Sequence, residues 1–459
     1  MSRARELVVI GGGAAGLSAA RTARALGAHP VLVTEGPPGG DCTFTGCVPS
    51  KTLLAAAAGG EDFATAMRRV RAAVGRVAAT EDEAALRAEG IEVMRGRAMF
   101  LSPDEVEVHG RVLSADRVVV ATGSAPLVPD IPGLPDVAPL TSDTVFALRE
   151  RPRSLVVLGG GAIGCELAQA FARLGSAVTV VEAAGRLLPS EDPEASAVIA
   201  ARFADEGVVV RTAVKAVRAT SDAGGVRLEL TDGEHVRAER VLVAVGRRPN
   251  TAWLRTGAAG IDLDHTGAVV TTDRLATTSP SRVYAAGDVT GRYALTHAAH
   301  LMGRVAARNA LARWDRVRLD DAVVPRVVFT DPEVAQVGVT EREAARTHPD
   351  ARVAYLPMAE VDRAITDGRG DGFVRIITRP RRLLGHTGGG RVIGATVVGA
   401  RAGELVHELA LAMRTGMFAG RLAQTVHAYP THAVAVQQAA AQFVGGHGGR
   451  VARPVEGLR

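Results

Sequence analysis

The sequence predicts an α/β protein that has two doubly wound domains and a C-terminal α+β domain. A pattern of apolar strand, glycine turn and alanine-rich helix occurs twice, at residues 7–35 and again at residues 155–182. From about residue 323, short strands are mixed with an amphipathic stretch at 404–413. The 459 residues are enough for about three domains, since a domain has roughly 100 to 200 residues.

Each copy of the repeated pattern carries a glycine fingerprint and ends on an acid. The apolar residues 7–10 lead into Gly11, Gly13 and Gly16, and residues 155–158 lead into Gly159, Gly161 and Gly164. The second strands end at Glu35 and Glu182. In a dinucleotide site such glycines form a tight turn, admit a pyrophosphate and let helix and strand pack, while the acid binds a ribose. One fingerprint could be an ordinary glycine turn, but two copies with their acids predict two dinucleotide sites.

Three further patterns predict local structure. The alternation at 226–230, followed by Asp232-Gly233, predicts a β-hairpin. The apolar runs at 241–245 and 283–286 predict buried strands. The glycine-rich tail beyond Gly445 predicts a frayed end.

The composition argues against several other classes of protein. A net charge of +5 over 459 residues is a thin excess, and 2 Trp, 4 Tyr and 10 Phe offer few stacking platforms, so nucleic-acid binding is not expected. A membrane span is not expected either, because it needs a run of about 18 or more apolar residues and the sequence has no such run. Three cysteines cannot form the disulfide framework of a secreted protein, so we expect a cytoplasmic location.

Cys42 and Cys47 lie in a short segment that follows two glycines, a setting that suits a small redox loop. A zinc site would need further Cys or His clusters, and only the distant Cys165 remains. Two buried structural thiols are the other alternative. On a regular helix, residues five apart rise about 7.5 Å and point in different directions, outside disulfide geometry. Gly46 must therefore break the helix if the two thiols are to meet.

Lys51 follows Cys47 by four residues in a chain that is very poor in lysine. The only other lysine is Lys215, and all remaining basic residues are arginine. A compact ammonium can stabilise a thiolate or another negative charge as a point source. The alternative is a surface lysine placed there by chance.

The segment Cys42-x4-Cys47 with the following Pro49-Ser50-Lys51 resembles the redox centre of the FAD-dependent pyridine nucleotide-disulfide oxidoreductases, the family of dihydrolipoamide dehydrogenase, glutathione reductase and mercuric reductase. Almost the whole chain shares the resemblance, since its segments follow the family's order: Gly11–Gly16, Ala121–Gly123, Gly159–Glu166, Ala244–Asn250, Ala285–Asp288 and Val324–Glu333.

The resemblance implies a domain order and a partner. It implies an FAD-binding domain at 1–149, an NAD(P)-binding domain at 150–250, a second part of the FAD domain at 251–322 and a dimerisation domain at 323–459. It also implies a homodimer in which each active site is shared between the two chains.

The resemblance further assigns cofactor binding to individual positions. The first fingerprint with Glu35 and Asp288 would hold FAD, and the second with Glu182 and Gly246 would hold the nicotinamide nucleotide. The complete set is Gly11, Gly13, Ala14, Ala15, Gly16, Glu35, Gly40, Lys51, Ala98, Thr122, Gly123, Ser124, Gly159, Gly161, Ala162, Ile163, Gly164, Glu182, Gly246, Asp288, Ala294, Leu295, Thr296 and His297. No metal ligand is predicted.

The family's chemistry implies roles for the catalytic residues. Hydride would pass from NAD(P)H to the flavin, and electrons would continue to a disulfide between Cys42 and Cys47. The cysteine at position 47 would face the flavin as the charge-transfer thiolate, and Cys42 would attack the acceptor. Lys51 would lie beside the flavin and pair with Glu166.

The sequence departs from the family near its C-terminus. Disulfide-reducing members have a His before Pro-Thr and a Glu five residues later, where this chain has Tyr429 and Val434. Tyrosine, with a pKa near 10, is a poor base at neutral pH, and valine cannot orient one. His427 and His432 are possible substitutes, although either could be purely structural. A standard lipoamide or glutathione mechanism is therefore not expected.

Two other departures concern cysteine chemistry. Asp41 stands where the family usually has threonine, and a carboxylate beside Cys42 should make its thiolate harder to form. The tyrosine at position 429 is similar to one found nearby in the mercuric-reductase-like branch of the family. Mercuric reductases, however, collect their metal with a C-terminal cysteine pair, and this chain has no cysteine after Cys165.

Taken with the resemblance, these features predict an NAD(P)H-dependent FAD oxidoreductase that acts on a small acceptor: a disulfide, a quinone or a metal ion. Glu182 favours the free ribose hydroxyl of NADH, although Arg186 could offset its repulsion of NADPH. A non-catalytic flavoprotein subunit or redox sensor in a larger complex is the alternative. The cysteine pair argues against that alternative, because a scaffold needs no electron relay.

Overall fold

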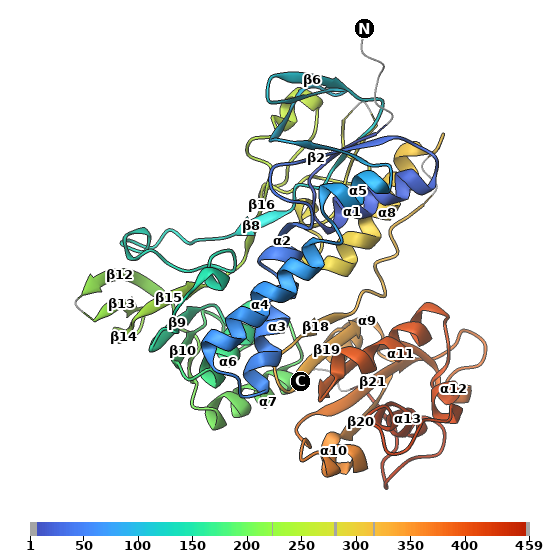
Figure 1. Cartoon of the computed structure of the whole chain (residues 1–459). Helices are drawn as coiled ribbons and strands as arrows, with labels where there is room; N and C mark the ends of the chain where they lie inside the picture. The colour runs from blue at the N-terminus through green and yellow to red at the C-terminus, as the bar shows by residue number, and fades with distance from the viewer. Residues whose placement is uncertain (1–6, 223, 280–281, 315–316, 456–459) are drawn as a thin grey trace. The chain divides into compact units, whose positions relative to one another are not determined.

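The computed structural model describes residues 7–222, 224–279, 282–314 and 317–455 (Figure 1). The chain forms two compact units, and each draws on separate segments. The first unit comprises Met1–Asp130, Ala138–Arg151 and Leu242–Asp320, and the second comprises Ile131–Val137, Pro152–Val241 and Asp321–Arg459. The predicted class, an α/β protein with two doubly wound folds and a C-terminal α+β domain, is confirmed.

The first unit is built on a parallel sheet with the order β17-β7-β1-β2-β3. Its strands are β1 (Leu7–Ile10), β2 (Pro30–Thr34), β3 (Glu92–Arg95), β7 (Val118–Val120) and β17 (Val283–Ala285). Helices α1 (Ala14–Ala25) and α8 (Thr296–Leu311) pack against each other. A Cβ on Gly303 would lie 2.2 Å from the carbonyl oxygen of Ala15, so the two helices approach almost to backbone contact.

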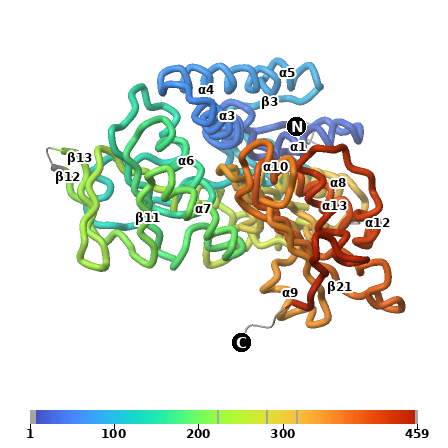
Figure 2. Tube along the Cα trace, turned by 90° about the horizontal axis from the view of Figure 1, so that it is seen from below, coloured from blue at the N-terminus to red at the C-terminus, as the bar shows by residue number. Residues whose placement is uncertain are grey.

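The first unit also contains further helices and two smaller sheets. The helices are α2 (Gly40–Phe44), α3 (Cys47–Ala58), α4 (Phe63–Ala78) and α5 (Glu83–Ala88). Helices α3 and α4 lie side by side, which both views show (Figure 2). A three-stranded antiparallel sheet contains β4 (Ala98–Ser102), β5 (Glu105–Val108) and β6 (Arg111–Ser114), and a two-stranded ladder pairs β8 (Ser124–Pro126) with β16 (Arg247–Pro249).

The second unit begins with a second doubly wound fold. Its sheet has the order β11-β10-β9-β15, with β9 (Ser154–Leu158), β10 (Ala177–Val181), β11 (Val209–Arg211) and β15 (Arg240–Val243), and with helices α6 (Ala162–Arg173) and α7 (Pro193–Asp205). An antiparallel meander of β12 (Ala216–Asp222), β13 (Gly225–Leu230) and β14 (His235–Ala238) is added to it. The pairing of β13 with β14 confirms the predicted hairpin.

The C-terminal part of the second unit is a six-stranded antiparallel sheet covered by helices. The sheet order is β18 (Arg326–Val328), β19 (Glu333–Gly338), β22 (Arg391–Gly399), β21 (Phe373–Arg379), β20 (Arg352–Pro357) and β23 (Arg453–Pro454). The helices are α9 (Glu341–Thr347), α10 (Asp362–Thr366), α11 (Ala402–Arg414), α12 (Ala419–Gln424) and α13 (Val434–Ala441). The amphipathic stretch predicted at 404–413 lies in α11, whose apolar face is buried.

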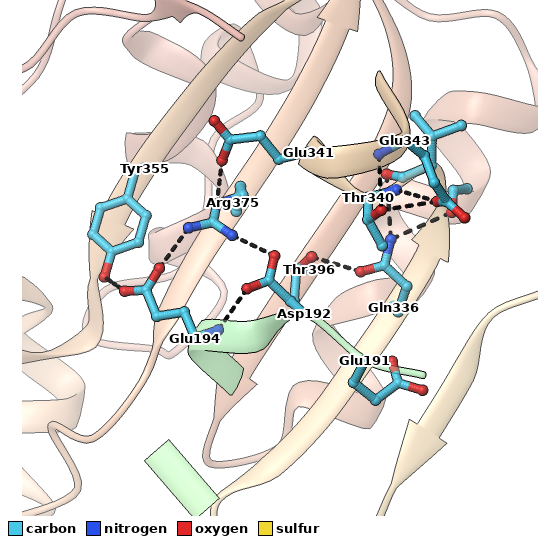
Figure 3. Close-up of polar contacts among 12 residues, drawn as sticks. Glu191, Asp192, Glu194, Gln336, Thr340, Glu341, Glu343, Tyr355, Arg375 and Thr396 are labelled. Atoms are coloured by element: carbon cyan, nitrogen blue, oxygen red, sulfur yellow. Dashed lines mark hydrogen bonds and ion pairs between the residues drawn. The ribbon is translucent and has the colours of Figure 1, made fainter. Parts of the chain in front are cut away.

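Arg375 of β21 ties this sheet to the second doubly wound fold within the second unit (Figure 3). Its buried guanidinium contacts three carboxylates: Asp192, Glu194 at 2.5 Å and Glu341 at 3.1 Å. Asp192 is the N-cap residue of α7, and its side chain accepts a hydrogen bond from the backbone N–H of Glu194 at 2.9 Å. We call Arg375 and these three acids the Arg375 cluster.

The expectation of a frayed tail is wrong for residues 446–455. β23 pairs with β20, and the Ala452 N–H donates to the carbonyl oxygen of Gln442 at 2.9 Å. Arg450 and Arg453 form ion pairs of 2.5 Å and 2.9 Å with Glu360 and Glu341. These distant partners hold a glycine-rich segment that has little structure-forming tendency of its own. Within the described residues, no helix is long and apolar enough to span a membrane.

Candidate active site

The cysteine segment consists of two helices separated by one glycine. α2 ends at Phe44, and the Thr45 N–H donates to the carbonyl oxygen of Asp41 at 2.9 Å. Gly46 then has φ −116° and ψ −113°, and α3 starts at Cys47. A Cβ on Gly46 would lie 2.8 Å from the carbonyl oxygen of Asp41, so the close approach of the two helices also requires glycine. The predicted break at Gly46 is confirmed.

The break brings the two cysteines together. The structure has them as two thiols rather than as a disulfide, and a hydrogen bond between them, reinforced by burial, raises the pKa of Cys42. The Cys47 sulfur lies 3.2 Å from the hydroxyl oxygen of Thr296, the first residue of α8. Lys51 lies on α3 one helical turn after Cys47. Cys42, Cys47 and Thr296 were all predicted, and the structure groups them.

A chain of polar contacts begins directly before Cys42. The carboxylate of Asp41 forms an ion pair with Arg247. Arg247 also donates to Ser124, through Nε to the hydroxyl at 2.7 Å and through Nη2 to the carbonyl at 2.8 Å. The Ser124 hydroxyl in turn donates to Asp288 at 2.7 Å. Partial burial raises the pKa of Asp41, and Arg247 opposes that rise.

A second carboxylate contacts the residue directly after Cys42. The hydroxyl of Thr43 donates to Glu81 at 3.0 Å, and Glu81 adds a smaller contribution to the raised pKa of Cys42. Sequence reasoning missed both Glu81 and Arg247. Arg247 had a signal, because it lies in the segment Ala244–Asn250 that supports the family resemblance. Glu81 had none, since nothing in its neighbours marks the loop between α4 and α5.

The first glycine turn has the shape that a dinucleotide requires. A Cβ on Gly16 would lie 1.8 Å from the carbonyl oxygen of Gly11, and a Cβ on Gly11 would lie 2.1 Å from that of Ala121. Gly13 caps α1 with no side-chain hydrogen bond, and a Cβ on Gly13 would meet nothing closer than the Cα of Gly40 at 4.0 Å. The uncapped helix end and the bare backbone at Gly13 leave N–H groups for a pyrophosphate, so this turn fits FAD.

The acid of the first copy is exposed. Glu35 pairs with Arg97 through two contacts, 2.6 Å and 3.2 Å long, and 57% of the Glu35 side chain is exposed. The Arg97 guanidinium lies 4.8 Å from the centre of the Trp253 ring. A ribose hydroxyl would therefore meet a carboxylate that is accessible from solvent.

The second glycine turn repeats the first. A Cβ on Gly164 would lie 1.9 Å from the carbonyl oxygen of Gly159, and a Cβ on Gly161 would have no atom within 4 Å. Gly161 caps α6 without a side-chain hydrogen bond. This turn fits the pyrophosphate of a nicotinamide nucleotide for the same reasons.

The acid of the second copy is buried and held by the backbone. The two oxygens of Glu182 accept N–H groups, from Gly160 at 2.5 Å and from Ala184 at 2.6 Å. Arg186 donates to the carbonyl oxygens of Pro189 at 2.8 Å and Glu191 at 3.1 Å. The side chain that could have offset the negative charge of Glu182 thus has backbone partners of its own.

The other predicted cofactor residues lie on the turns and helix ends of the two folds. Ala14 and Ala15 open α1, Gly40 opens α2, and Ala162 and Ile163 open α6. Thr122, Gly123 and Ser124 follow β7, Gly246 lies between β15 and β16, and Ala294 to His297 lead into α8. Ala98 is buried in β4, within a cluster of core residues. Their contacts with cofactors stay predictions.

The predicted C-terminal residues lie in the second unit, each with a local partner. Tyr429 is exposed, and its hydroxyl donates to Asp362 at 2.9 Å, which raises the pKa of Tyr429. His427 has both ring nitrogens occupied, by Glu408 at 3.1 Å and by the carbonyl oxygen of Thr425 at 2.9 Å. Val434, which stands at the position of the family's glutamate, is the first residue of α13.

Two further buried groups of the second unit have partners there. Nε2 of His432 lies 3.1 Å from Asp367. Glu166, on α6, accepts the N–H of Phe329 at 2.9 Å. The predicted pairing of Glu166 with Lys51 stays a prediction. Sequence reasoning missed Glu408, which lies on α11 and belongs to no recognisable motif.

Two dinucleotide-binding folds, a pair of thiols beside the first and a separate C-terminal sheet domain define a flavoprotein disulfide reductase. Residues 5–303 match the pyridine nucleotide-disulphide oxidoreductase family, and residues 324–440 match the dimerisation domain of that family. The chain therefore belongs to the pyridine nucleotide-disulphide oxidoreductases, whose members use FAD and NAD(P)H. The dimerisation domain supports a homodimer.

Relatives of two kinds cover nearly the whole chain. A mercuric reductase of Bacillus cereus is 33% identical, over 95% of this chain and 71% of its own length. A dihydrolipoyl dehydrogenase of Thermus scotoductus is 35% identical, over 95% of this chain and 96% of its own. Among solved structures, the Cu(II) complex of the HOCl-induced flavoprotein disulfide reductase RclA from Escherichia coli has a TM-score of 0.88 at 29% identity, covering 96% of this chain and 99% of that one. LpdA from Mycobacterium tuberculosis also has a TM-score of 0.88, at 30% identity, with 96% and 100% covered.

Proposed function

We propose that this flavoprotein disulfide reductase uses NADH and relays electrons through Cys42 and Cys47 to a small acceptor other than lipoamide or glutathione disulfide. The observation that carries the proposal is the contact between the two thiols across the break at Gly46. A pair of structural thiols would need no such break. The contact of Cys47 with Thr296 further supports the relay.

The cofactor assignment follows from the two turns. FAD would be held by the first turn, by Glu35 and by Asp288, and NADH by the second turn with Glu182. When bound, FAD takes a hydride from NADH and supplies two electrons to the disulfide. The protein orients the two nucleotides and holds the reduced cysteines close enough for their disulfide to form again.

Reduction of a disulfide acceptor requires a proton for each of the two thiolates that leave. The Cys42 thiolate would attack one sulfur of the acceptor, and the other sulfur would leave as a thiolate that takes up a proton. Cys47 would then attack Cys42, the internal disulfide would form, and the second acceptor thiolate would take up another proton. General acid–base help with such steps contributes roughly 10²- to 10⁴-fold.

The C-terminal segment is poorly equipped to supply those protons. The phenol of Tyr429 is bound to Asp362, and the ring nitrogens of His427 are engaged by Glu408 and Thr425. A quinone takes up two electrons and two protons to become a hydroquinone, and a metal ion takes up electrons alone. Neither has a leaving sulfur to protonate, so their reduction depends less on this help. The names of the mercuric reductases and the copper complex of RclA support a metal ion as one such acceptor.

We also propose the finer architecture that the family implies. The FAD domain would comprise residues 1–149 and 251–322, the NAD(P) domain 150–250 and the dimerisation domain 323–459. The homodimer would share each active site between its chains, and the enzyme would work in the cytoplasm. Limited proteolysis and light scattering of the FAD-loaded protein test the boundaries and the dimer.

An acceptor screen tests the function. Purified FAD-loaded protein is supplied with NADH and with a quinone, Cu(II), Hg(II), lipoamide or glutathione disulfide, and NADH oxidation is followed. We expect turnover with a quinone or a metal ion to exceed turnover with either disulfide. Lipoamide turnover equal to quinone turnover would contradict the acceptor class. If NADH fails to reduce the flavin at all, the relay is refuted in favour of a non-catalytic flavoprotein.

A further inference from the structure

The residue before Cys42 carries a negative charge that the relay does not need. Asp41 is the second residue of α2 and directly precedes Cys42, the residue that we assign to attack the acceptor. A carboxylate near a thiol disfavours the thiolate. A partner that neutralises Asp41 would therefore act on the reactivity of Cys42.

Arg247 is that partner, and it is held from elsewhere. It is the first residue of β16, whose backbone pairs with β8 in the register Arg247 with Pro126 and Pro249 with Ser124. Its guanidinium is largely buried, with 18% of the side chain exposed, whereas the side chain of Asp41 is 52% exposed. The ladder fixes the arginine, and the arginine fixes the more exposed carboxylate.

The remaining contacts of Arg247 connect the cysteine segment, α2 and the start of α3, with a predicted cofactor residue. Ser124 accepts from Arg247 Nε at 2.7 Å and donates to Asp288 at 2.7 Å, so its hydroxyl is used in both directions. Arg247 Nε also lies 3.8 Å from the Asp288 carboxylate. One cation thus serves the carboxylate beside Cys42 and the carboxylate that would bind FAD.

We propose that Arg247 is a positioning residue for the thiol chemistry: its ion pair with Asp41 cancels the charge beside Cys42 and fastens α2 to the Ser124–Asp288 pair. The ion pair of Asp41 with Arg247 then leaves no net charge directly in front of the cysteine. The role rests on the proposed relay, since it concerns the cysteine assigned to attack the acceptor.

Other ionisable groups near Cys42 set the background of this effect. Cys47 on α3 forms a hydrogen bond with Cys42, and Glu81 acts on it from the loop between α4 and α5. Asp143 and Asp288 act on Asp41 itself. The effect of Arg247 must therefore be measured with Cys47 removed and with Glu81, Asp143 and Asp288 left in place.

The test is the pH dependence of Cys42 alkylation by iodoacetamide in the FAD-loaded Cys47→Ser protein, in which Cys165 is fully buried. Arg247→Met should raise the apparent pKa of Cys42 and slow alkylation near neutral pH about 3- to 10-fold, since one pKa unit changes the thiolate fraction tenfold. Adding Asp41→Thr should restore the rate. Arg248→Met, which removes the exposed neighbouring arginine, should leave the profile unchanged.

The outcomes separate this role from a general structural one. Equal slowing by Arg247→Met with and without Asp41→Thr, or no slowing at all, would overturn the proposal. Arg247→Lys, which keeps the charge but not the planar fork, should fall between the wild type and Arg247→Met, and serves if Arg247→Met does not fold. The alkylation rate needs neither NADH nor an acceptor, so failure of the proposed function would leave this readout intact.

Discussion

The chain contains the same strand, glycine turn and helix twice, yet the two copies continue differently after their acids. In the first copy the exposed Glu35 is followed by the redox loop with Cys42 and Cys47. In the second copy the buried Glu182 is followed by α7, whose N-cap residue Asp192 joins the Arg375 cluster. The glycine turn is thus a common device for binding a dinucleotide, and the segment after the acid decides what else each copy does.

The largest expected effect comes from the Arg375 cluster of the second copy. Arg375→Met removes the cation that pairs with Asp192 and Glu194 and leaves Glu341 with Arg453 alone. Removing one partner of a buried ion pair costs about 3–5 kcal/mol. Urea unfolding of the FAD-loaded protein should show this loss in the free energy of unfolding. Arg21→Met, which breaks an exposed pair with Glu89, should cost less than about 1 kcal/mol. Equal losses would mean that the cluster does not anchor the second fold.

The two glycine turns should fail separately. In Gly16→Ala the new methyl group would lie 1.8 Å from the Gly11 carbonyl oxygen, and in Gly164→Ala it would lie 1.9 Å from that of Gly159. Overpacking costs about 1–3 kcal/mol, so we expect roughly 10- to 100-fold weaker FAD binding in the first variant and NADH binding in the second. Fluorescence titration of each cofactor measures this.

The controls for the glycine turns lie in the same copies. Gly36→Ala and Gly185→Ala place a methyl group where no atom lies within 4 Å, so neither should weaken binding. Weaker FAD binding in Gly164→Ala than in Gly16→Ala would reverse the assignment of the two sites.

Nucleotide preference tests the acid of the second copy. The Glu182 carboxylate is fixed by two backbone N–H groups, and Arg186 has carbonyl partners, so the phosphate of NADPH should meet an uncompensated negative charge. We expect kcat/KM for NADH to exceed that for NADPH about tenfold or more. Arg186→Ala should leave the ratio nearly unchanged. A preference for NADPH in the unmodified protein would show that another cation serves the second copy.

The smallest expected effect is the response to restoring the family's histidine. Tyr429→His supplies an imidazole but leaves Val434 in place of the orienting carboxylate, so lipoamide turnover should rise only about threefold or less, far below the usual contribution of general acid–base catalysis. Quinone turnover should not change. A large gain in lipoamide turnover would show that the redox loop lacks nothing else for disulfide chemistry.

Local patterns in the sequence predicted much of this structure. The two fingerprints, the hairpin at β13 and β14 and the apolar face of α11 each depend on neighbours within one element, so their periodicity reveals them. The break at Gly46 was also predictable, because helix geometry keeps residues five apart from meeting.

The contacts that organise the site depend on residues far apart in the chain. Arg247 reaches Asp41 across 206 positions, and Arg375 reaches Asp192 across 183, so no local pattern reveals either pair. The tail at 446–455 illustrates the same limit. Its glycine content predicted a frayed end, and only the pairing of β23 with β20 and the ion pairs of Arg450 and Arg453 hold it in place.

The measurement that tests the account most directly is an anaerobic titration of the FAD-loaded protein with NADH, followed by absorbance and by thiol labelling. After two electrons we predict a long-wavelength thiolate-to-flavin band and the appearance of two alkylatable cysteines, Cys42 and Cys47. Cys47→Ser should lack the band. If NADH bleaches the flavin without the band and without new thiols, then the cysteine pair is not the relay and the central claim is contradicted.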